Sequence, residues 1–129
     1  MEDAAERQEL FGDRAAVPGI TWRSSGLGIR VLQPGAGAAI TLHDRVRLHY
    51  TGRLKDGAVF DSSRTTGKPA DFVVQYLVPG MAAALVSLRS GAQAELFIPP
   101  ELGYGNIRRG NIPANAGLVF EVEILAVNP

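Results

Sequence analysis

The run YLVPGMAAAL, residues 76–85, decides the fold that we expect for this chain. It begins as an extended segment, turns at Pro79 and continues as a short apolar helix. Pro79 suits a first helical turn because the N–H that proline lacks would have no partner there. Met81, Leu85 and Leu88 follow at helical spacing and give the helix one apolar face. Nearly all other patterned segments favour strands, so we expect the strands to wrap this helix.

The composition of the 129-residue chain is that of one soluble globular domain, with 46% hydrophobic and 20% charged residues. Thirteen Lys and Arg residues balance 13 Asp and Glu residues, which argues against binding to nucleic acid or to a membrane surface. Cysteine is absent, so disulfides and thiolate chemistry are excluded, and two histidines are too few for most zinc sites. We expect a monomer without metal or cofactor.

Alternating polar and apolar residues predict strands on both sides of the helix. The predicted strands are residues 20–23, 29–32, 45–50 and 58–61 before it, a restart near Phe72, and residues 92–98 and 118–127 after it. Within residues 45–50, Val46, Leu48 and Tyr50 face inward, and His49 is expected on the wet face as a surface residue. The pattern predicts an α+β domain: an antiparallel sheet of five or six strands, curled around one short helix.

The first 19 residues are expected to form an N-terminal arm, partly helical or disordered, ahead of a domain that spans residues 20–129. Leu10 and Phe11 are the apolar anchor of the arm. They either pack on the domain or form a docking motif for another protein. The chain starts without an apolar leader and has no stretch long enough to span a membrane, so we expect a cytoplasmic protein. An exported form with a removed leader stays open.

Four aromatic side chains fall on the inward faces of the predicted strands: Tyr50, Phe60, Phe72 and Phe120. They could form a sealed core, and the pattern alone favours that interpretation. Two features favour a ligand pocket instead. Asp61 follows Phe60 near a sheet end, and Tyr104 lies between glycines in a long loop, residues 101–116. An aromatic cup with a carboxylate and a phenol at its rim is typical of a binding site.

Six segments of the chain come in the order and near-spacing that are typical of the FKBP family. They are LHYTG (48–52), FDSS (60–63), LVPGM (77–81), IPPELGYG (98–105), IP (112–113) and LVFEVE (118–123). Over about residues 25–127 the chain therefore resembles these peptidyl-prolyl cis-trans isomerases, which are named for binding macrolide immunosuppressants. The proline after Val78 and the Ile-Pro-Pro run are similar to bacterial or plant members.

This resemblance implies an enzyme that accelerates rotation about X–Pro bonds in peptides and folding proteins, with the role of a folding helper or chaperone. Its expected partners are proline-containing peptides and unfolded chains. It implies a shallow apolar pocket with catalytic residues Tyr50, Phe60, Asp61, Val78, Tyr104 and Phe120, and with substrate-binding residues Phe72, Leu77, Met81 and Ile112. In the family, the N–H at the Val78 position holds one ligand carbonyl and the Tyr104 hydroxyl holds another. The Tyr50 hydroxyl and the Asp61 carboxylate form the polar side.

Two positions depart from the family pattern. Met81 stands at the pocket floor, where the family often has tryptophan, and Ala70 stands where an aromatic rim residue is common. Because methionine is flexible, we expect retained isomerase activity and weaker binding of macrolide inhibitors. The alternative function is a non-catalytic FKBP-like module that holds proline peptides or a partner. Arg108 and Arg109 are either solvated charges or the source of a preference for acidic residues near the substrate proline.

Overall fold

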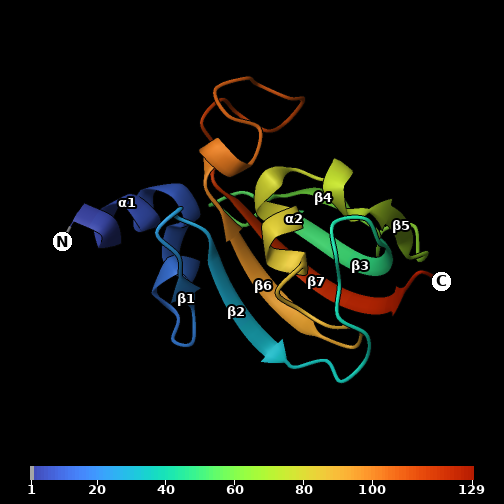
Figure 1. Cartoon of the computed structure of the whole chain (residues 1–129). Helices are drawn as coiled ribbons and strands as arrows, with labels where there is room; N and C mark the ends of the chain where they lie inside the picture. The colour runs from blue at the N-terminus through green and yellow to red at the C-terminus, as the bar shows by residue number, and fades with distance from the viewer. Residues whose placement is uncertain (1) are drawn as a thin grey trace.

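One antiparallel sheet of seven strands curls around a short helix in the computed structural model, which describes residues 2–129 (Figure 1). The strands are β1 (Thr21–Trp22), β2 (Gly28–Gln33), β3 (Arg45–Arg53), β4 (Val59–Ser62), β5 (Ala70–Val73), β6 (Gln93–Ile98) and β7 (Leu118–Val127). The helices are α1 (Glu2–Phe11) and α2 (Pro79–Leu85), with 3-10 turns η1 (Gly12–Ala16), η2 (Val74–Tyr76) and η3 (Pro100–Leu102). No helix in residues 2–129 is long and apolar enough to cross a membrane. The α+β class is confirmed.

The expected count of five or six strands is wrong for the described range, which has seven. Two strands are very short: β1 has two residues and β5 has four. Two residues cannot display an alternating pattern, and four residues are the shortest run that can. β1 is held by pairing with β2, and β5 by pairing with β3. Local sequence indicates extended segments over residues 20–23 and near Phe72, and tertiary pairing makes them strands of the sheet.

The strand β3 organises the sheet because three other strands pair with it. The order is β1-β2-β6-β7-β3-β4, and β5 pairs with β3 outside this path. One edge of β3 pairs along its length with β7. β5 pairs with the first half of β3 (Leu48 opposite Ala70) and β4 pairs with its end (Gly52 opposite Asp61). This arrangement brings β4 and β5 to the same region as the middle of β3.

The helix α2 lies against the concave face of the sheet, as the sequence predicts (Figure 1). Pro79 occupies its first turn, and the Val78 carbonyl accepts the N–H of Ala82 at 3.1 Å. Gly80 permits close contact with β6, since a Cβ there would lie 2.6 Å from Cγ2 of Ile98. Leu85 is fully buried. The start of α2 is therefore held tightly against the sheet.

Both faces of β6 and β7 are covered. The inner face packs on α2, and Phe120, Val122 and Ile124 belong to this core as expected. The outer face carries Phe97 and Val119, which pack with Phe11 at the end of α1. Phe11 is 1% exposed, and its ring centroid lies 5.6 Å from that of Phe97 and 5.8 Å from that of Trp22. The apolar anchor of the N-terminal segment thus packs on the domain.

A buried carboxylate fastens the N-terminal segment to this outer face. Glu95 on β6 is 5% exposed and accepts two hydrogen bonds from the Arg14 guanidinium, at 3.0 and 2.7 Å. Arg30 on β2 adds a third contact at 3.4 Å. The hydrogen bonds to Glu95 raise the pKa of Arg14 above its ordinary value. We did not expect this cluster, because alternation alone places Glu95 on a face open to water.

His49, which is expected as a surface residue, is only partly exposed. Its side chain is half-buried, and Nδ1 lies 2.9 Å from the Ser63 hydroxyl. The same hydroxyl accepts the backbone N–H of Tyr50 at 2.8 Å. The chain that leaves β4 folds back over this part of β3, and alternation on β3 alone does not predict that cover.

Candidate active site

A cavity of about 130 Å³ opens between the start of α2, the inner face of β3 and β7, and the loop between η3 and β7. Its lining is mostly apolar and consists of Leu48, Tyr50, Asp61, Phe72, Leu77, Val78, Met81, Tyr104 and Phe120. The volume is far above the ~15 Å³ that admits one water molecule. The inward-facing rings therefore do not seal the core here, and there is room for a small ring such as that of proline.

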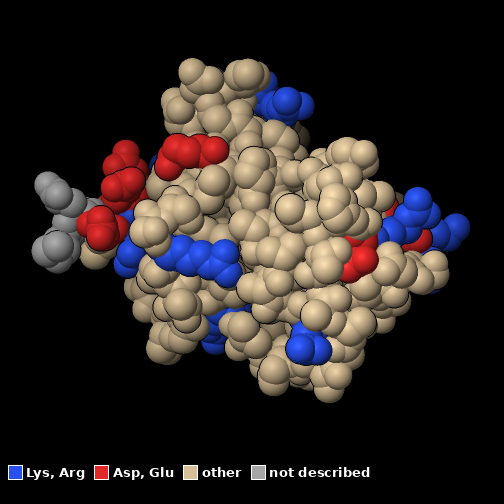
Figure 2. All heavy atoms as spheres, viewed as in Figure 1, with Lys and Arg blue, Asp and Glu red and all other residues tan. Residues whose placement is uncertain are grey.

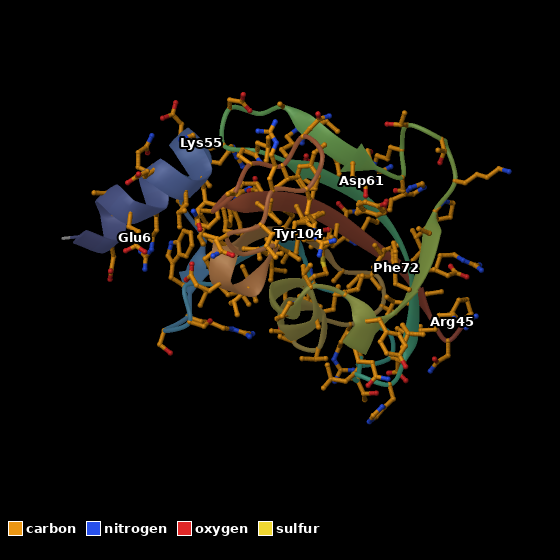
Figure 3. The ribbon with its side chains drawn as sticks, turned by 90° about the horizontal axis from the view of Figure 1, so that it is seen from above. Glu6, Arg45, Lys55, Asp61, Phe72 and Tyr104 are labelled. Carbon is orange, nitrogen blue, oxygen red and sulfur yellow. The ribbon has the colours of Figure 1, made fainter. Side chains whose placement is uncertain are left out.

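Three segments far apart in sequence supply the polar groups and the rim of this cavity. Figure 3 shows Tyr104 over the middle of the molecule, with Asp61 and Phe72 to one side on β4 and β5. The structure brings together eight of the ten site residues that the resemblance implies; Phe60 and Ile112 are the exceptions.

A larger hollow of about 450 Å³ lies on the outer face, between α1 and the turn after β1. Charged side chains contribute much of its lining, among them Asp3, Glu6, Arg7 and Glu101. Sites for small ligands are mostly apolar, with a few convergent polar groups. We therefore place the candidate site at the smaller cavity.

The backbone N–H of Val78, at the start of α2, is available to donate a hydrogen bond to a ligand. Val78 immediately precedes the helix and lines the cavity. In the described part of the chain its N–H donates no hydrogen bond, whereas its carbonyl accepts one from Ala82. The first N–H groups of a helix have no partner within the helix, and here no side chain caps them. This donor can therefore bind a carbonyl oxygen of a ligand.

The polar side of the cavity is a phenol paired with a carboxylate. The Tyr50 hydroxyl donates a hydrogen bond to Oδ2 of Asp61 at 3.0 Å. Partial burial of the ring raises the pKa of Tyr50 to about 12, and the bond to Asp61 contributes to the same shift. The phenol therefore stays protonated at neutral pH and remains a hydrogen-bond donor.

The aromatic wall is built around Phe120. Its ring lies 6.4 Å from that of Tyr50 and 5.5 Å, edge to face, from that of Phe60. Tyr50 in turn meets Phe72 at 5.7 Å. Such edge-to-face and tilted pairs contribute about 0.5–1.5 kcal/mol each beyond the burial of area. These contacts hold the ring of Phe120 in one orientation at the cavity wall.

Phe60, which the resemblance places in the pocket, is absent from the lining of this cavity, and its ring packs edge to face on Phe120. Gly52 on β3 leaves the space that Phe60 fills: a Cβ at Gly52 would lie 2.5 Å from Cζ of Phe60 and 2.8 Å from Cε1 of Phe120. Phe60 therefore supports Phe120 in the aromatic wall.

Ile112 is also absent from the lining. It is 8% exposed and packs into the main core, where it anchors a tight turn with Arg109. Leu48 takes a place in the lining that sequence reasoning missed. Its inward position on β3 was predictable from the alternation, but a strand pattern gives the face of a residue and not its nearness to a cavity.

The loop that carries Tyr104 is fixed at its base. The N–H groups of Gly103 and Gly105 both donate to the Pro100 carbonyl, at 3.0 and 2.8 Å. The N–H of Asn115 donates to the Gly105 carbonyl at 2.9 Å and closes the loop. Tyr104 is half-buried between these points. Its phenol is thereby held over the cavity without belonging to a helix or strand.

Few charged side chains lie beside the cavity: Asp61 belongs to its lining, and Arg109 stacks on Tyr104. In Figure 2 most of the centre of the face that carries α2 is tan, with scattered charged side chains around it. Within residues 2–129, no three His, Asp or Glu side chains are grouped to hold a metal ion. The chemistry that the described site offers is therefore burial of an apolar group, with a few hydrogen-bond donors around it.

Comparison with known proteins identifies the same family that the motifs indicate. A family model described as FKBP-type peptidyl-prolyl cis-trans isomerase matches residues 37–125. The chain is 46% identical over 125 residues to the FKBP-type 22 kDa peptidyl-prolyl cis-trans isomerase of Escherichia coli strain K12, covering 96% of this chain and 61% of that protein.

Two solved structures share the fold. The crystal structure of FkpA from Escherichia coli superposes with a TM-score of 0.88 at 38% identity, over 99% of this chain and 60% of that one. A peptidyl-prolyl cis-trans isomerase from Pseudomonas syringae pv. tomato gives a TM-score of 0.84 at 31% identity, over 99% and 95% of the two chains.

The chain spans between about half and 61% of the length of the first curated relatives that it matches. The family match over residues 37–125 includes β3 to β6, most of β7 and every residue that lines the cavity. The chain therefore belongs to the family of FKBP-type peptidyl-prolyl cis-trans isomerases.

Proposed function

We propose that this chain accelerates the cis–trans rotation of X–Pro bonds in peptides and unfolded proteins. The observation that carries the proposal is the apolar cavity of about 130 Å³ with the unpartnered Val78 N–H at its edge. The cavity accepts the proline ring, and Val78 binds a neighbouring carbonyl of the substrate. The family membership supports the same reaction.

The mechanism needs no covalent step. Rotation about an X–Pro bond is slow because it breaks amide resonance, with a barrier of ~20 kcal/mol. A catalyst has only to bind the twisted amide better than the planar one. The planar amide has the larger carbonyl dipole, which water solvates well, so transfer into an apolar cavity disfavours it more than the twisted form. A ten-thousand-fold acceleration requires about 5.5 kcal/mol of this discrimination.

Each polar group then has a positioning role. The Val78 N–H and the Tyr104 hydroxyl hold the peptide on the two sides of the rotating bond, so that one side turns against the other. Tyr50, kept protonated, and Asp61 form a polar edge beside the twisted carbonyl. Phe120 and Phe72 pack against the proline ring, while Phe60 keeps Phe120 in place.

Met81 at the floor is the basis for a second part of the proposal, that macrolide inhibitors bind more weakly than in members with tryptophan there. Met81 lines the cavity and is 5% exposed. A flexible thioether gives a large rigid ligand a less defined surface than an indole does. The monomeric state and the cytoplasmic location stay predictions.

The test is an exchange measurement by NMR on a short X–Pro peptide, with wild-type chain and with Asp61→Asn, Tyr104→Phe and Phe60→Leu. We expect acceleration by the wild type and a loss of tenfold or more in kcat/KM for at least Asp61→Asn or Phe60→Leu, a change of about 1.4 kcal/mol in transition-state binding. Asp56→Asn, on the exposed turn before β4, is the matched control that should keep full activity.

The outcomes separate the two candidate functions. Peptide binding without acceleration would make the chain a non-catalytic proline-binding module, the alternative that Met81 favours. Unchanged rates for both Asp61→Asn and Phe60→Leu would contradict the assignment of the site.

A further inference from the structure

One positive charge is held at the rim of the cavity by stacking. The guanidinium carbon of Arg109 lies 5.1 Å from the centroid of the Tyr104 ring, and Tyr104 lines the cavity. Arg109 itself is exposed. A guanidinium over the face of a tyrosine is attracted by the ring quadrupole. The charge of Arg109 is therefore held beside a side chain that lines the cavity.

The backbone of Arg109 is fixed as well. Arg109 and Ile112 exchange two backbone hydrogen bonds, at 2.9 and 2.8 Å, around a turn in which Gly110 has φ +53°. Ile112 is buried in the core and anchors that turn. Arg108 precedes the turn and is equally exposed, but stacks on no ring in the described part of the chain. The two arginines thus differ in placement though they share a loop and a charge.

Arg109 also lacks an acidic partner in the described residues. Arg14, Arg30, Arg47, Arg53 and Arg64 each form an ion pair, whereas neither Arg108 nor Arg109 has a carboxylate oxygen within 4 Å. Figure 2 shows blue atoms at the top of the molecule, where Figure 1 places the loop before β7. Asp61, the acidic group of the cavity lining, already accepts the Tyr50 hydroxyl. An incoming carboxylate would therefore meet an uncompensated cation at the loop side of the cavity.

We propose that Arg109 selects X–Pro substrates that carry an acidic side chain next to the proline. The inference rests on the proposed isomerase function and adds the substrate class. A residue adjacent to the proline lies ~3.8 Å along the chain from it, so its carboxylate can reach the rim. The planar guanidinium can bind a carboxylate through its edge while its face stays on Tyr104. An exposed pair of this kind corresponds to a two- to fivefold effect, as an order of magnitude.

The experiment compares peptides that differ only beside the proline. Glu, Gln and Lys are placed either before or after the proline, and kcat/KM is measured by NMR exchange at low salt and again at about 1 M salt. We expect the order Glu, Gln, Lys in at least one of the two placements, with about two- to fivefold between Glu and Gln at low salt. The difference should shrink in high salt, because the Debye length falls to about 3 Å.

Variants of the loop assign the effect to one arginine. Arg109→Gln should bring the Glu-to-Gln ratio close to one, and Arg109→Lys should retain part of the preference because the charge remains. Arg108→Gln is the matched control, with the same change of charge on the same loop, and should keep most of the wild-type ratio. An equal loss of preference in Arg108→Gln and Arg109→Gln would overturn the role of the stacked arginine.

The failure of this inference is distinct from the failure of the proposed function. If the wild type accelerates the Gln peptide but shows no preference for Glu in either placement, the role of Arg109 is wrong and the isomerase function stands. If no peptide is accelerated, the proposed function is wrong, and the selectivity claim falls with it.

Discussion

The Tyr50 hydroxyl donates to the Asp61 carboxylate at 3.0 Å, across the antiparallel pair of β3 and β4. Burial of the Tyr50 ring, followed by this hydrogen bond, raises the pKa of Tyr50 from 10.0 to about 12. The protonated phenol therefore stabilises the fold fully below about pH 10, and that contribution is lost as pH rises through about 12. Asp61→Asn should lower the pKa of Tyr50 only part of the way toward 10, since burial is the larger cause.

Spectrophotometric titration of phenolate absorbance checks this prediction. The curve for Tyr50→Phe is subtracted from those for the wild type and for Asp61→Asn, so that each difference reports Tyr50 alone. A pKa of Tyr50 unchanged by Asp61→Asn would show that the hydrogen bond contributes nothing to the shift.

Gly52 and Phe60 should be energetically coupled. A Cβ at Gly52 would lie 2.5 Å from Cζ of Phe60, so Gly52→Ala must displace this ring and with it Phe120. We expect Gly52→Ala to cost about 1–3 kcal/mol in the free energy of unfolding and to lower kcat/KM through Phe120. In the Phe60→Leu background the added methyl has more room, so its cost should fall by about 1 kcal/mol. Urea denaturation of the four chains gives the cycle, and strict additivity would contradict the packing described.

The Arg14–Glu95 contact should stabilise the protein more than an exposed ion pair. Arg14→Met removes both hydrogen bonds to a carboxylate that is 5% exposed and leaves it with Arg30 alone. We expect a loss of about 1–3 kcal/mol in the free energy of unfolding, because a buried charge loses most of its partners.

The control for this measurement is Arg47→Met. Arg47 and Asp71 form an equally close pair, but their side chains are 43% and 34% exposed. Ion pairs exposed to solvent contribute little to stability, so this change should be nearly neutral. Equal losses for the two variants would mean that burial of Glu95 does not matter.

Met81→Trp should tighten the binding of a macrolide immunosuppressant. Met81 lines the cavity at its floor, and an indole there would offer the ligand a rigid aromatic plane. We expect a two- to tenfold gain in affinity, about 0.5–1.5 kcal/mol, by titration calorimetry. Met81→Leu, which keeps the volume and adds no ring, is the matched control and should give no gain. In the wild type, emission from Trp22 should barely respond to the ligand, because Trp22 packs with Phe11 and Phe97 on the other face.

The predictable parts of the fold are the elements whose own sequence carries a periodic pattern of apolar residues. The strand predicted over residues 118–127 has the bounds of β7, and its two glutamates, Glu121 and Glu123, alternate with apolar residues. The apolar face of α2 follows from helical spacing with Pro79 at its start. For β5 the sequence shows only that the alternation of polar and apolar residues restarts near Phe72. Its four residues depend on pairing with β3.

In the site, too, the sequence pattern predicts some features and packing decides the others. Alternation puts Tyr50, Phe60 and Phe120 on inward faces, but only packing decides which of them borders the cavity. The rings of Phe60 and Phe120 meet over Gly52, and the space that a glycine leaves gives no periodic signal in the sequence. The roles of Val78 and Tyr104 came from the family resemblance, because a backbone N–H and a loop phenol have no pattern of their own.

The stretch that matches the family model, residues 37–125, is smaller than the unit that has to fold together. β2, which lies before it, pairs with β6, and Phe11 covers Phe97 and Val119. A fragment cut at residue 37 would keep every cavity-lining side chain, yet it would present an open sheet edge and a bare apolar patch to other molecules. Such a fragment should self-associate. A shortened version of this protein should therefore retain α1, although that helix does not contact the cavity.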